Sequence, residues 1–512
     1  MRLVGASGAV PIDQPSTPQV YFVRRQRGRV EAQLMSDHFP MMVPGASGVE
    51  PLEVRAPYDD KLIATVDQAD EAAVETAMTN AYRLFRDRDA WMNEAQRIEI
   101  LDRTADIMHE RRGQLALEAA REGGKPLMDS LVEVDRAVDG VKLCVKTLRT
   151  EAGTVIPMDI TASSAGRIAF TLHEPIGVVA AFSAFNHPLN LIVHQVGPAV
   201  AAGCPVIVKP SETTPLSCMR FVQILREAGL PDAWCQPVLP TNHDISGSII
   251  ADRRLGFFTF IGSGRVGWML RSRLAPGARC SLEHGGAAPV VIAADADLDD
   301  ALPVLAKGGF YHAGQVCVSV QRVFAHRKIA QKFADGLAKL AGKLKVGDPT
   351  RKDTEVGPLI REAEVKRVHE WVGEAVGGGA KLVGGGEPVG TTCYAPTVLF
   401  DPPADAIVST KEIFGPVVCV YPFDDLDEAI ARANSLPFAF QAAVWTANLD
   451  TALRASHRLD AAAVMVNDHT AFRVDWMPFA GLRESGLGVG GIPHTLRDMQ
   501  VEKMTVIRSK EL

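Results

Sequence analysis

Cys317 is the residue of the chain best suited to covalent chemistry. It lies in the segment Phe310–Ser319, FYHAGQVCVS, directly after a Gly-Gln-Val triplet and before a predicted helix or turn. A nucleophilic thiol needs a lowered pKa or a nearby base, and the backbone N–H groups of a helix start could lower the pKa. The alternative is a buried cysteine that acts only as a small hydrophobe.

Glu283 and Asn186 could support such a nucleophile. Glu283 precedes two glycines in SLEHGGAAPVVI, at the entry to a predicted strand, where glycines permit close backbone approach. Its carboxylate could act as a general base, directly or through one water. Asn186, in FSAFNHPLN, follows a predicted strand and could donate to a developing oxyanion. The alternatives are a surface glutamate and a simple turn before Pro188.

Two further segments are suited to nucleotide binding. In VIVKPSETTP, Lys209 and Glu212 follow a predicted buried strand, so a lysine and a carboxylate could bind ribose hydroxyls or phosphate. In FTFIGSGRVG, the spacing of Gly262, Gly264 and Gly267 is that of a dinucleotide-binding loop, a weak signal on its own. The segments Lys411–Val418 (KEIFGPVV) and Met477–Gly488 (MPFAGLRESGLG) are two more clusters of this kind.

These segments follow strands of two predicted parallel sheets. Apolar runs alternate with helix-length segments, which indicates doubly wound α/β architecture. The first set of runs is IGVVAAFSA, CPVIVKP, CQPVLP and LGFFTFIG; the second is APVVIA, RVFAH, YAPTVL, VVCVYPF, AAVWTA and AAAVMVN. In such sheets ligands bind beyond the carboxyl ends of the strands.

Other elements surround these sheets. We expect a hairpin in EVRAPYDDKLIATV, with its turn at 57–60, and helices from Asp67 to about Thr150. We also expect a projecting hairpin at 151–172 and a final strand in MQVEKMTVIRS. Residues 1–48 lack periodicity and are predicted to be an extension, either an arm or a poorly ordered leader.

Composition excludes several classes of protein. The 512 residues are 47% hydrophobic, with 54 basic and 61 acidic side chains, a net charge of −7. This balance argues against nucleic-acid binding and against an acidic disordered chain. Eight cysteines without a CxxC pair favour reduced thiols, and we predict no metal site. No targeting segment or membrane helix is recognised, which predicts a cytoplasmic protein.

Taken in order, these motifs resemble the aldehyde dehydrogenase superfamily over almost the whole chain from about residue 50. The resemblance rests on FNHP, KPSE, FIGSGRVG, LEHGG, GQVC, EIFGPV and PFAGLRESG. The stretch AGQVCVSVQR is most similar to lactaldehyde, succinic-semialdehyde and non-phosphorylating glyceraldehyde-phosphate dehydrogenases. The resemblance to the superfamily implies an NAD-binding domain at 49–150 and 173–283, a catalytic domain at 284–491, and an oligomerisation element at 151–172 and 492–512.

The resemblance also implies roles for individual residues. Cys317 would attack the aldehyde, Asn186 would hold the oxyanion, and Glu283 would activate the water that hydrolyses the thioester. The implied cofactor-binding residues are Lys209, Ser211, Glu212, Gly262, Ser263, Glu412 and Phe414. Glu212 favours NAD, with NADP as the alternative, because a carboxylate there repels a 2′-phosphate.

Some positions depart from the family pattern. Gly490 stands where several members carry a glutamate that is sometimes linked to a proton relay, which puts the relay in doubt. The other departures are Phe185 for Trp, His312 for Asn, Ala480 for Gly and Arg483 for Lys. Glu283 itself favours hydrolysis to the free acid. A coenzyme-A-acylating enzyme and an inactive relative are the alternatives.

The substrate is predicted to be a small polar or anionic aldehyde. By alignment, the residues lining or approaching its tunnel are His187, Asn190, His194, Tyr311 and Arg473, a set too polar for long alkyl chains. Arg473 could clamp a carboxylate or phosphate; alternatively it pairs with Asp475 on a surface loop. The oligomerisation element predicts a homodimer or a homotetramer.

Overall fold

The computed structural model describes residues 37–512. The predicted extension therefore lies outside the described residues up to residue 36. Residues 37–39 form a strand, β1 (Asp37–Phe39), which pairs in parallel with β3 (Leu62–Gln68). Phe39 is buried, so the folded chain begins before residue 49, where the sequence predicted it to begin.

The predicted hairpin is present as β2 (Val49–Arg55) and β3, and the predicted helices follow it. The first helix begins at Glu71, because Asp67 still belongs to β3 and Asp70 caps the helix by accepting from Ala73 N–H. The helices are α1 (Glu71–Arg86), α2 (Glu94–Glu110), α3 (Arg112–Gly123) and α4 (Leu127–Thr150).

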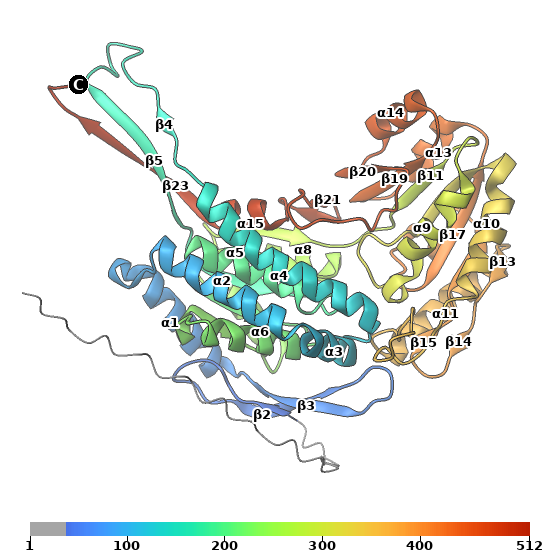
Figure 1. Ribbon diagram of the computed structural model, residues 1–512, viewed down its shortest axis with the longest axis horizontal. Helices are drawn as coiled ribbons and strands as arrows, with labels where there is room; N and C mark the ends of the chain where they lie inside the picture. The colour runs from blue at the N-terminus through green and yellow to red at the C-terminus, as the bar shows by residue number, and fades with distance from the viewer. Residues whose placement is uncertain (1–36) are drawn as a thin grey trace, which may run out of the picture. The chain divides into compact units, whose positions relative to one another are not determined.

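A six-stranded sheet has the order β22-β10-β9-β6-β7-β8. Helices α2 and α4, which Figure 1 labels, lie on one side of it. Only β22 runs antiparallel to its neighbour. The strands are β6 (Val178–Phe182), β7 (Val206–Lys209), β8 (Cys235–Pro237), β9 (Leu255–Ile261), β10 (Arg279–Glu283) and β22 (Gly486–Leu487). Its intervening helices are α5 (Asn190–Ala202), α6 (Leu216–Glu227), α7 (His243–Ala251) and α8 (Gly264–Ser272).

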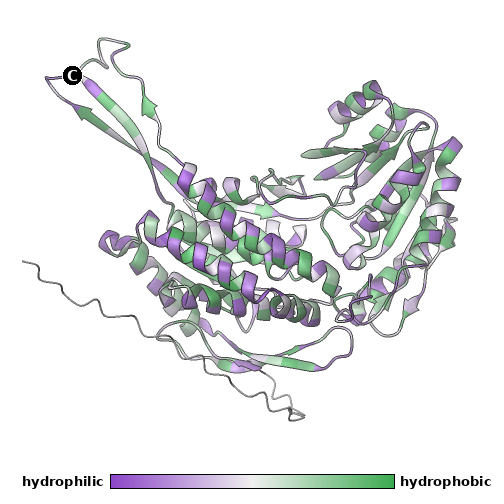
Figure 2. Cartoon of the chain, in the orientation of Figure 1, coloured by the Kyte–Doolittle hydropathy of each residue, from purple (hydrophilic) through white to green (hydrophobic). Residues whose placement is uncertain are grey.

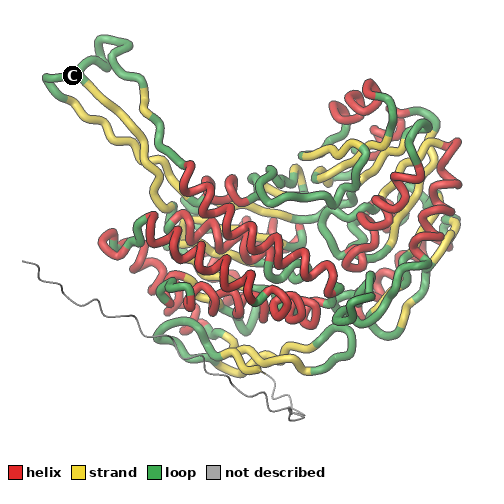
Figure 3. The backbone as a smooth tube through the Cα atoms, viewed as in Figure 1, coloured by secondary structure: helices red, strands yellow, loops and turns green. Residues whose placement is uncertain are grey.

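Helices cover both faces of this sheet (Figure 3). Along β6, Val179 and Ala181 pack into a core with α2, α4, α5 and α6, whereas Val178 and Ala180 pack with α1 and α7. Both faces are thus apolar, as the continuous apolar runs predicted. Figure 2 shows the same pattern, with hydrophobic residues on the strands and hydrophilic ones on outer helix faces.

A second, seven-stranded sheet has the order β13-β16-β17-β12-β11-β19-β20, with only β13 antiparallel to its neighbour. The strands are β11 (Pro289–Ile292), β12 (Arg322–His326), β13 (Lys381–Gly384), β16 (Thr397–Phe400), β17 (Val417–Phe423), β19 (Gln441–Trp445) and β20 (Ala463–Val466). Its helices are α9 (Leu298–Phe310), α10 (Arg327–Ala341), α11 (Glu362–Gly377), α12 (Ile407–Thr410), α13 (Leu426–Ala433) and α14 (Leu449–Arg458).

The predicted projecting hairpin and the final strand form one small sheet. Its central strand is β5 (Arg167–Pro175), which pairs antiparallel with both β4 (Val155–Ile156) and β23 (Gln500–Arg508). Helix α15 (Ile492–Asp498) leads into β23. Two short pairs, β14 (Pro388–Val389) with β15 (Cys393–Tyr394) and β18 (Phe438–Ala439) with β21 (Leu482–Arg483), complete the strands.

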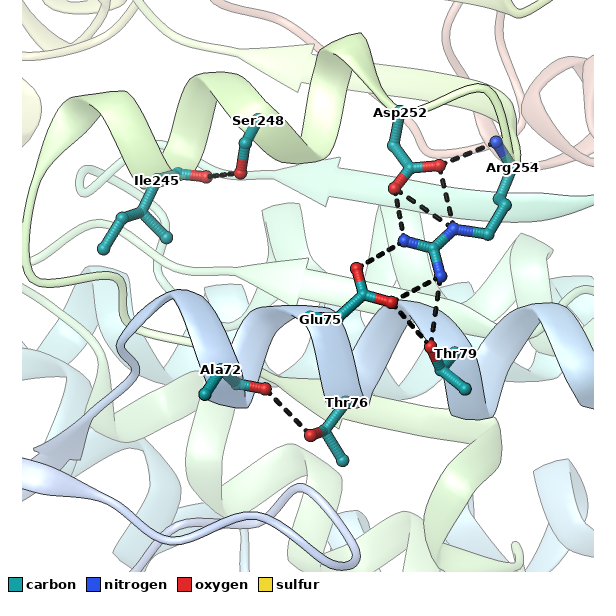
Figure 4. A network of polar contacts seen from close by, with 8 residues as sticks. All are labelled: Ala72, Glu75, Thr76, Thr79, Ile245, Ser248, Asp252 and Arg254. Atoms are coloured by element: carbon teal, nitrogen blue, oxygen red, sulfur yellow. Dashed lines mark hydrogen bonds and ion pairs between the residues drawn. The ribbon is translucent and has the colours of Figure 1, made fainter.

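A charge network joins α1 to the start of β9 (Figure 4). The Arg254 guanidinium lies 2.6 Å from carboxylate oxygens of both Glu75 and Asp252. It lowers the pKa of Glu75 to about 2. The network thereby fixes the entry of the strand that ends at the glycine-rich loop.

No helix among residues 37–512 is long and apolar enough to cross a membrane.

Candidate active site

A cavity of about 1530 Å³ is lined by loops that follow strands of both large sheets. It gathers nearly all the residues predicted from sequence. His194 is the exception, since it does not line the cavity and instead contacts Arg473 from behind. The predicted residues that line it are Asn186, His187, Asn190, Lys209, Ser211, Glu212, Gly262, Ser263, Glu283, Tyr311, Cys317, Glu412, Phe414 and Arg473.

Cys317 lies in a turn, and no helix begins there. Helix α9 ends at Phe310, and His312 and Ala313 have left-handed φ values of 49° and 54°. Of the helix or turn predicted after Cys317, the structure has the turn, so no helix start lowers the pKa of the thiol. Burial raises the pKa of Cys317 to about 12, and the charge of Arg473 opposes that rise. The thiol is protonated at rest and needs a base to react.

Gln315 fixes the turn that carries Cys317. Its side-chain amide donates to the carbonyls of His312 and Pro358, and its Oε1 accepts from Ile360 N–H at 2.9 Å. Its own carbonyl accepts from Asn186 Nδ2 at 2.9 Å. One N–H of the Asn186 amide is thus bound to the turn that carries Cys317, and the second remains to donate to a ligand.

Glu283 ends β10 and is enclosed in the cavity wall. Burial raises its pKa, while Arg473 lowers it. Its carboxylate rests against Gly490, where an added Cβ would lie 2.0 Å from Oε1. The glycine that departs from the family pattern therefore provides the space that the Glu283 side chain occupies.

One wall of the cavity is suited to the nucleotide half of a cofactor. Lys209 Nζ lies 3.4 Å from Glu212 Oε1 at the end of β7. Ser263 is the N-cap of α8 but makes no side-chain capping bond, so the first N–H groups of this helix remain available beside the cavity. A helix N-terminus and a carboxylate fit a diphosphate and ribose hydroxyls respectively.

The facing wall carries Glu412 and Phe414. Glu412 Oε1 accepts from Gly286 N–H at 3.2 Å, and a Cβ on Gly285 would lie 1.7 Å from that oxygen. Burial raises the pKa of Glu412 to about 8. Phe414 has a left-handed φ of 47° and packs edge-on against Phe185. Both walls together fit a dinucleotide cofactor.

A buried charge network ends the cavity on the other side of Cys317. Asp475 accepts two hydrogen bonds from Arg136, at 2.6 and 3.1 Å, and one from His194 Nε2 at 2.8 Å. Burial lowers the pKa of His194 to about 4, so its ring is neutral and Nδ1 accepts from Arg473 at 3.2 Å. The Asp475 side chain is 3% exposed.

Among the side chains in direct contact, the network holds two guanidiniums and one carboxylate, an excess of one positive charge. Glu283 is a further acidic group whose charge acts on Arg473. Arg473 approaches Asp475 only to 4.0 Å and stacks on the ring of Phe479. Its buried Nε has no hydrogen-bond partner among residues 37–512. Both Arg473 and Arg136 line the cavity. The predicted alternative, a pair of Arg473 with Asp475, is present at 4.0 Å, but both side chains are buried and the pair does not lie on a surface loop.

Sequence reasoning did not identify Arg136 or Gln315 as site residues. Arg136 lies on α4, more than 300 residues from Asp475, and belongs to no motif. Its only signal is a charged residue close to apolar positions of the buried helix face, Val134 and Ala137. Gln315 belongs to the predicted GQVC motif, but no role was predicted for it.

His187 and Tyr311, which also line the cavity, form a hydrogen-bonded pair.

Comparison with known proteins identifies the family. The model of the "Aldehyde dehydrogenase family" matches residues 43–505. The "3-sulfolactaldehyde dehydrogenase" of Priestia aryabhattai is 36% identical over 461 residues, covering 90% of this chain and 95% of the relative.

Solved structures agree with this match. Aldehyde dehydrogenase 21 of Physcomitrella patens, in complex with the reaction product succinate, has a TM-score of 0.88 at 33% identity, covering 93% of this chain and 99% of that one. GapN of Methanocaldococcus jannaschii, a glyceraldehyde-3-phosphate dehydrogenase complexed with NADP, has a TM-score of 0.86 at 30% identity, covering 90% and 100%. The chain belongs to the aldehyde dehydrogenase family, whose members are NAD(P)-dependent oxidoreductases, as its motifs predicted.

Proposed function

We propose that this protein oxidises a small anionic aldehyde to the corresponding carboxylic acid, with Cys317 as nucleophile and NAD as the preferred cofactor. The observation that carries the proposal is the excess positive charge at the end of the cavity that holds Cys317. Arg136 and Arg473 lie within 4.0 Å of a single carboxylate, Asp475. Glu283 is a further acidic group whose charge acts on Arg473. A buried unpaired charge is costly unless a ligand neutralises it.

The first step is the attack of Cys317 Sγ on the aldehyde carbon. The thiol proton must leave, and Glu283 is the base in the same cavity whose raised pKa suits it to accept one. The free N–H of Asn186 and the backbone N–H of Cys317 would hold the oxyanion of the hemithioacetal. Collapse of this oxyanion gives a thioester on Cys317.

The bound dinucleotide supplies the acceptor of two electrons and one hydrogen in that oxidation. Lys209, Glu212 and Ser263 would hold its nucleotide half, and Glu412 and Phe414 would position its nicotinamide half. Glu212 supports NAD over NADP, because its carboxylate can accept from two ribose hydroxyls and repels a 2′-phosphate. Lys209 at 3.4 Å moderates that repulsion.

Hydrolysis of the thioester completes the reaction. Glu283 would first release the thiol proton to solvent and then take a proton from water. The hydroxyl would add to the acyl carbon, and the C–S bond would break to release the acid and the Cys317 thiolate. The two-step route explains why the site needs both a soft nucleophile and a carboxylate base. Glu283 is the reason to prefer hydrolysis to transfer onto coenzyme A.

The anionic group of the substrate would bind the two arginines. The Arg473 guanidinium lines the cavity and would donate to a carboxylate, sulfonate or phosphate oxygen of the substrate. The names of relatives fit this charge, since one is a 3-sulfolactaldehyde dehydrogenase and another is a succinate-semialdehyde dehydrogenase of Arabidopsis thaliana. A substrate with a neutral end would leave the Arg473 guanidinium without a counter-charge from the ligand.

A homodimer or a homotetramer is also part of the proposal. The small sheet of β4, β5 and β23 exposes large apolar side chains, which favour association. They are Val155, Ile168, Leu172, Met504, Val506 and Ile507. Light scattering of the full chain tests this, and a monomer would contradict it. A cytoplasmic location stays a prediction from sequence.

The test is reduction of NAD and NADP with succinic semialdehyde, lactaldehyde, glycolaldehyde and a medium-chain alkanal. We expect turnover with NAD and release of free acid without coenzyme A. Cys317→Ala should abolish it, a loss of about 10⁴-fold or more, while Cys280→Ala, a half-buried cysteine outside the cavity, should not. A requirement for coenzyme A would favour the acylating alternative. Intact NAD binding without turnover of any aldehyde would favour an inactive relative.

A further inference from the structure

His187 and Tyr311 form a hydrogen-bonded pair inside the cavity. His187 Nε2 lies 2.9 Å from the Tyr311 hydroxyl, and both side chains line the cavity with Arg473 and Cys317. His187 follows the proposed oxyanion donor Asn186, and Tyr311 follows the last residue of α9. The chemistry proposed above uses neither of them.

Both members of the pair are neutral. Burial and the nearby cations Lys125, Arg136 and Arg473 lower the pKa of His187 well below its usual value. Burial raises the pKa of Tyr311. A neutral imidazole and a phenol share the bond in either direction, since Nε2 can donate to the phenol oxygen or accept from its O–H. The phenol group keeps either a free O–H or a free lone pair for a ligand.

We propose that Tyr311, oriented by His187, recognises a hydroxyl group that the substrate carries between its aldehyde and its anionic end. This inference rests on the proposed function, because it places the hydroxyl on the same anionic aldehyde. The substrate class is therefore a small acidic hydroxyaldehyde.

A hydroxyl group fits the pair better than the other groups a small substrate can offer. It both donates and accepts, so it matches whichever direction the His187–Tyr311 bond takes. An anionic oxygen only accepts, and the two arginines already meet that need. A methylene group would leave the phenol oxygen without a partner, which a site built for a hydroxyl penalises strongly.

The chain contains a second His–Tyr pair that serves as a matched control. His369 Nδ1 lies 3.3 Å from the Tyr394 hydroxyl, and neither residue lines the cavity. Tyr394→Phe removes the same hydroxyl oxygen as Tyr311→Phe, but from a buried tyrosine outside the cavity. Any general effect of losing a hydroxyl from a buried tyrosine appears in both variants.

The experiment compares substrates that differ only by a hydroxyl group. The anionic pair is glyceraldehyde 3-phosphate and 3-oxopropyl phosphate, and the neutral pair is lactaldehyde and propanal. The ratio of kcat/KM between the members of each pair is measured for the wild type, Tyr311→Phe, His187→Phe and Tyr394→Phe. Thermal melting of each variant shows that it is folded.

We expect the wild type and Tyr394→Phe to prefer the hydroxylated member by about 10-fold or more. Tyr311→Phe should bring the ratio to within about 3-fold of unity, chiefly by slowing the hydroxylated member, and His187→Phe should lower it part of the way. Equal losses on both members in Tyr311→Phe, or a wild type without hydroxyl preference, would overturn the inference. The proposed function fails separately, if the wild type prefers the neutral pair to the anionic pair.

Discussion

Two charge networks in this molecule consist of guanidinium and carboxylate groups, but in opposite proportions. In the network of Figure 4, one guanidinium, Arg254, lies between two carboxylates, Glu75 and Asp252. At the end of the cavity one carboxylate, Asp475, lies between two guanidiniums, Arg136 and Arg473. The first has an excess of negative charge and the second an excess of positive charge.

Their surroundings make the difference. The Glu75 side chain is 62% exposed, so water screens the excess negative charge of the first network. The Asp475 and Arg473 side chains are 3% and 9% exposed, and the space beside them is the cavity. An excess charge at the surface carries no functional information, whereas a buried excess facing a cavity predicts a ligand of opposite charge.

Removing one carboxylate from each network should separate them most clearly. Asp475→Asn leaves two buried guanidiniums without a counter-charge and should lower the free energy of unfolding by about 3–5 kcal/mol. Glu75→Gln, in the exposed network, should cost about 1 kcal/mol or less. Urea unfolding of both variants measures the difference, and similar losses would mean that burial does not distinguish the networks.

Removing the arginine that contacts a ligand should affect activity in one network only. Arg473→Gln should lower kcat/KM for succinic semialdehyde by about 30- to 100-fold, because a charge-assisted bond to the anion is lost. Arg254→Gln should leave it within about 2-fold, as this residue lies away from the cavity. An unchanged kcat/KM in Arg473→Gln would place the anion elsewhere.

The second arginine of the cavity should matter less. Arg136 already donates two hydrogen bonds to Asp475, so less of its charge is available to a ligand. We expect Arg136→Gln to lower kcat/KM for succinic semialdehyde by about 3- to 10-fold, mainly through KM. A loss larger than that of Arg473→Gln would reverse the assignment of the two arginines.

Acid should weaken the exposed network first, with the smallest effect. Glu75 and Asp475 both have lowered pKa values in the folded state. Each carboxylate therefore stabilises the fold fully above its unfolded pKa and progressively less as the pH falls below that value. For Glu75 this window runs from about 4.5 to about 2. The pKa of Asp475 is lowered further, so its contribution should persist at pH 3. The stability differences between wild type and each variant, measured from pH 5 to 3, test this order.

Sequence patterns predicted the parts of the fold that depend on local periodicity. The apolar runs became the parallel strands of two sheets, and the hairpin, the tail strand and the helices up to Thr150 are present. Strand order did not follow from the pattern, nor did the addition of β22 to a sheet whose other strands end at Glu283. β1 was missed because three residues are too short to show a period.

Sequence motifs predicted those site residues whose position depends only on the end of their own strand. Lys209, Glu212 and Ser263 follow strand ends, so proximity to the cavity follows from the parallel sheet. The turn at Cys317 and the buried network depend on contacts between distant segments. Arg136, Asp475 and the clamp by Gln315 belong to this second kind, because tertiary packing alone brings them to the cavity.

The central claim is that the buried excess charge selects an anionic aldehyde. Its most direct test is the ratio of kcat/KM for succinic semialdehyde to kcat/KM for butanal, measured on the wild-type protein with NAD. These substrates have the same chain length and differ by the carboxylate. We expect a ratio of about 100 or more. A ratio near one, or a preference for butanal, would contradict it.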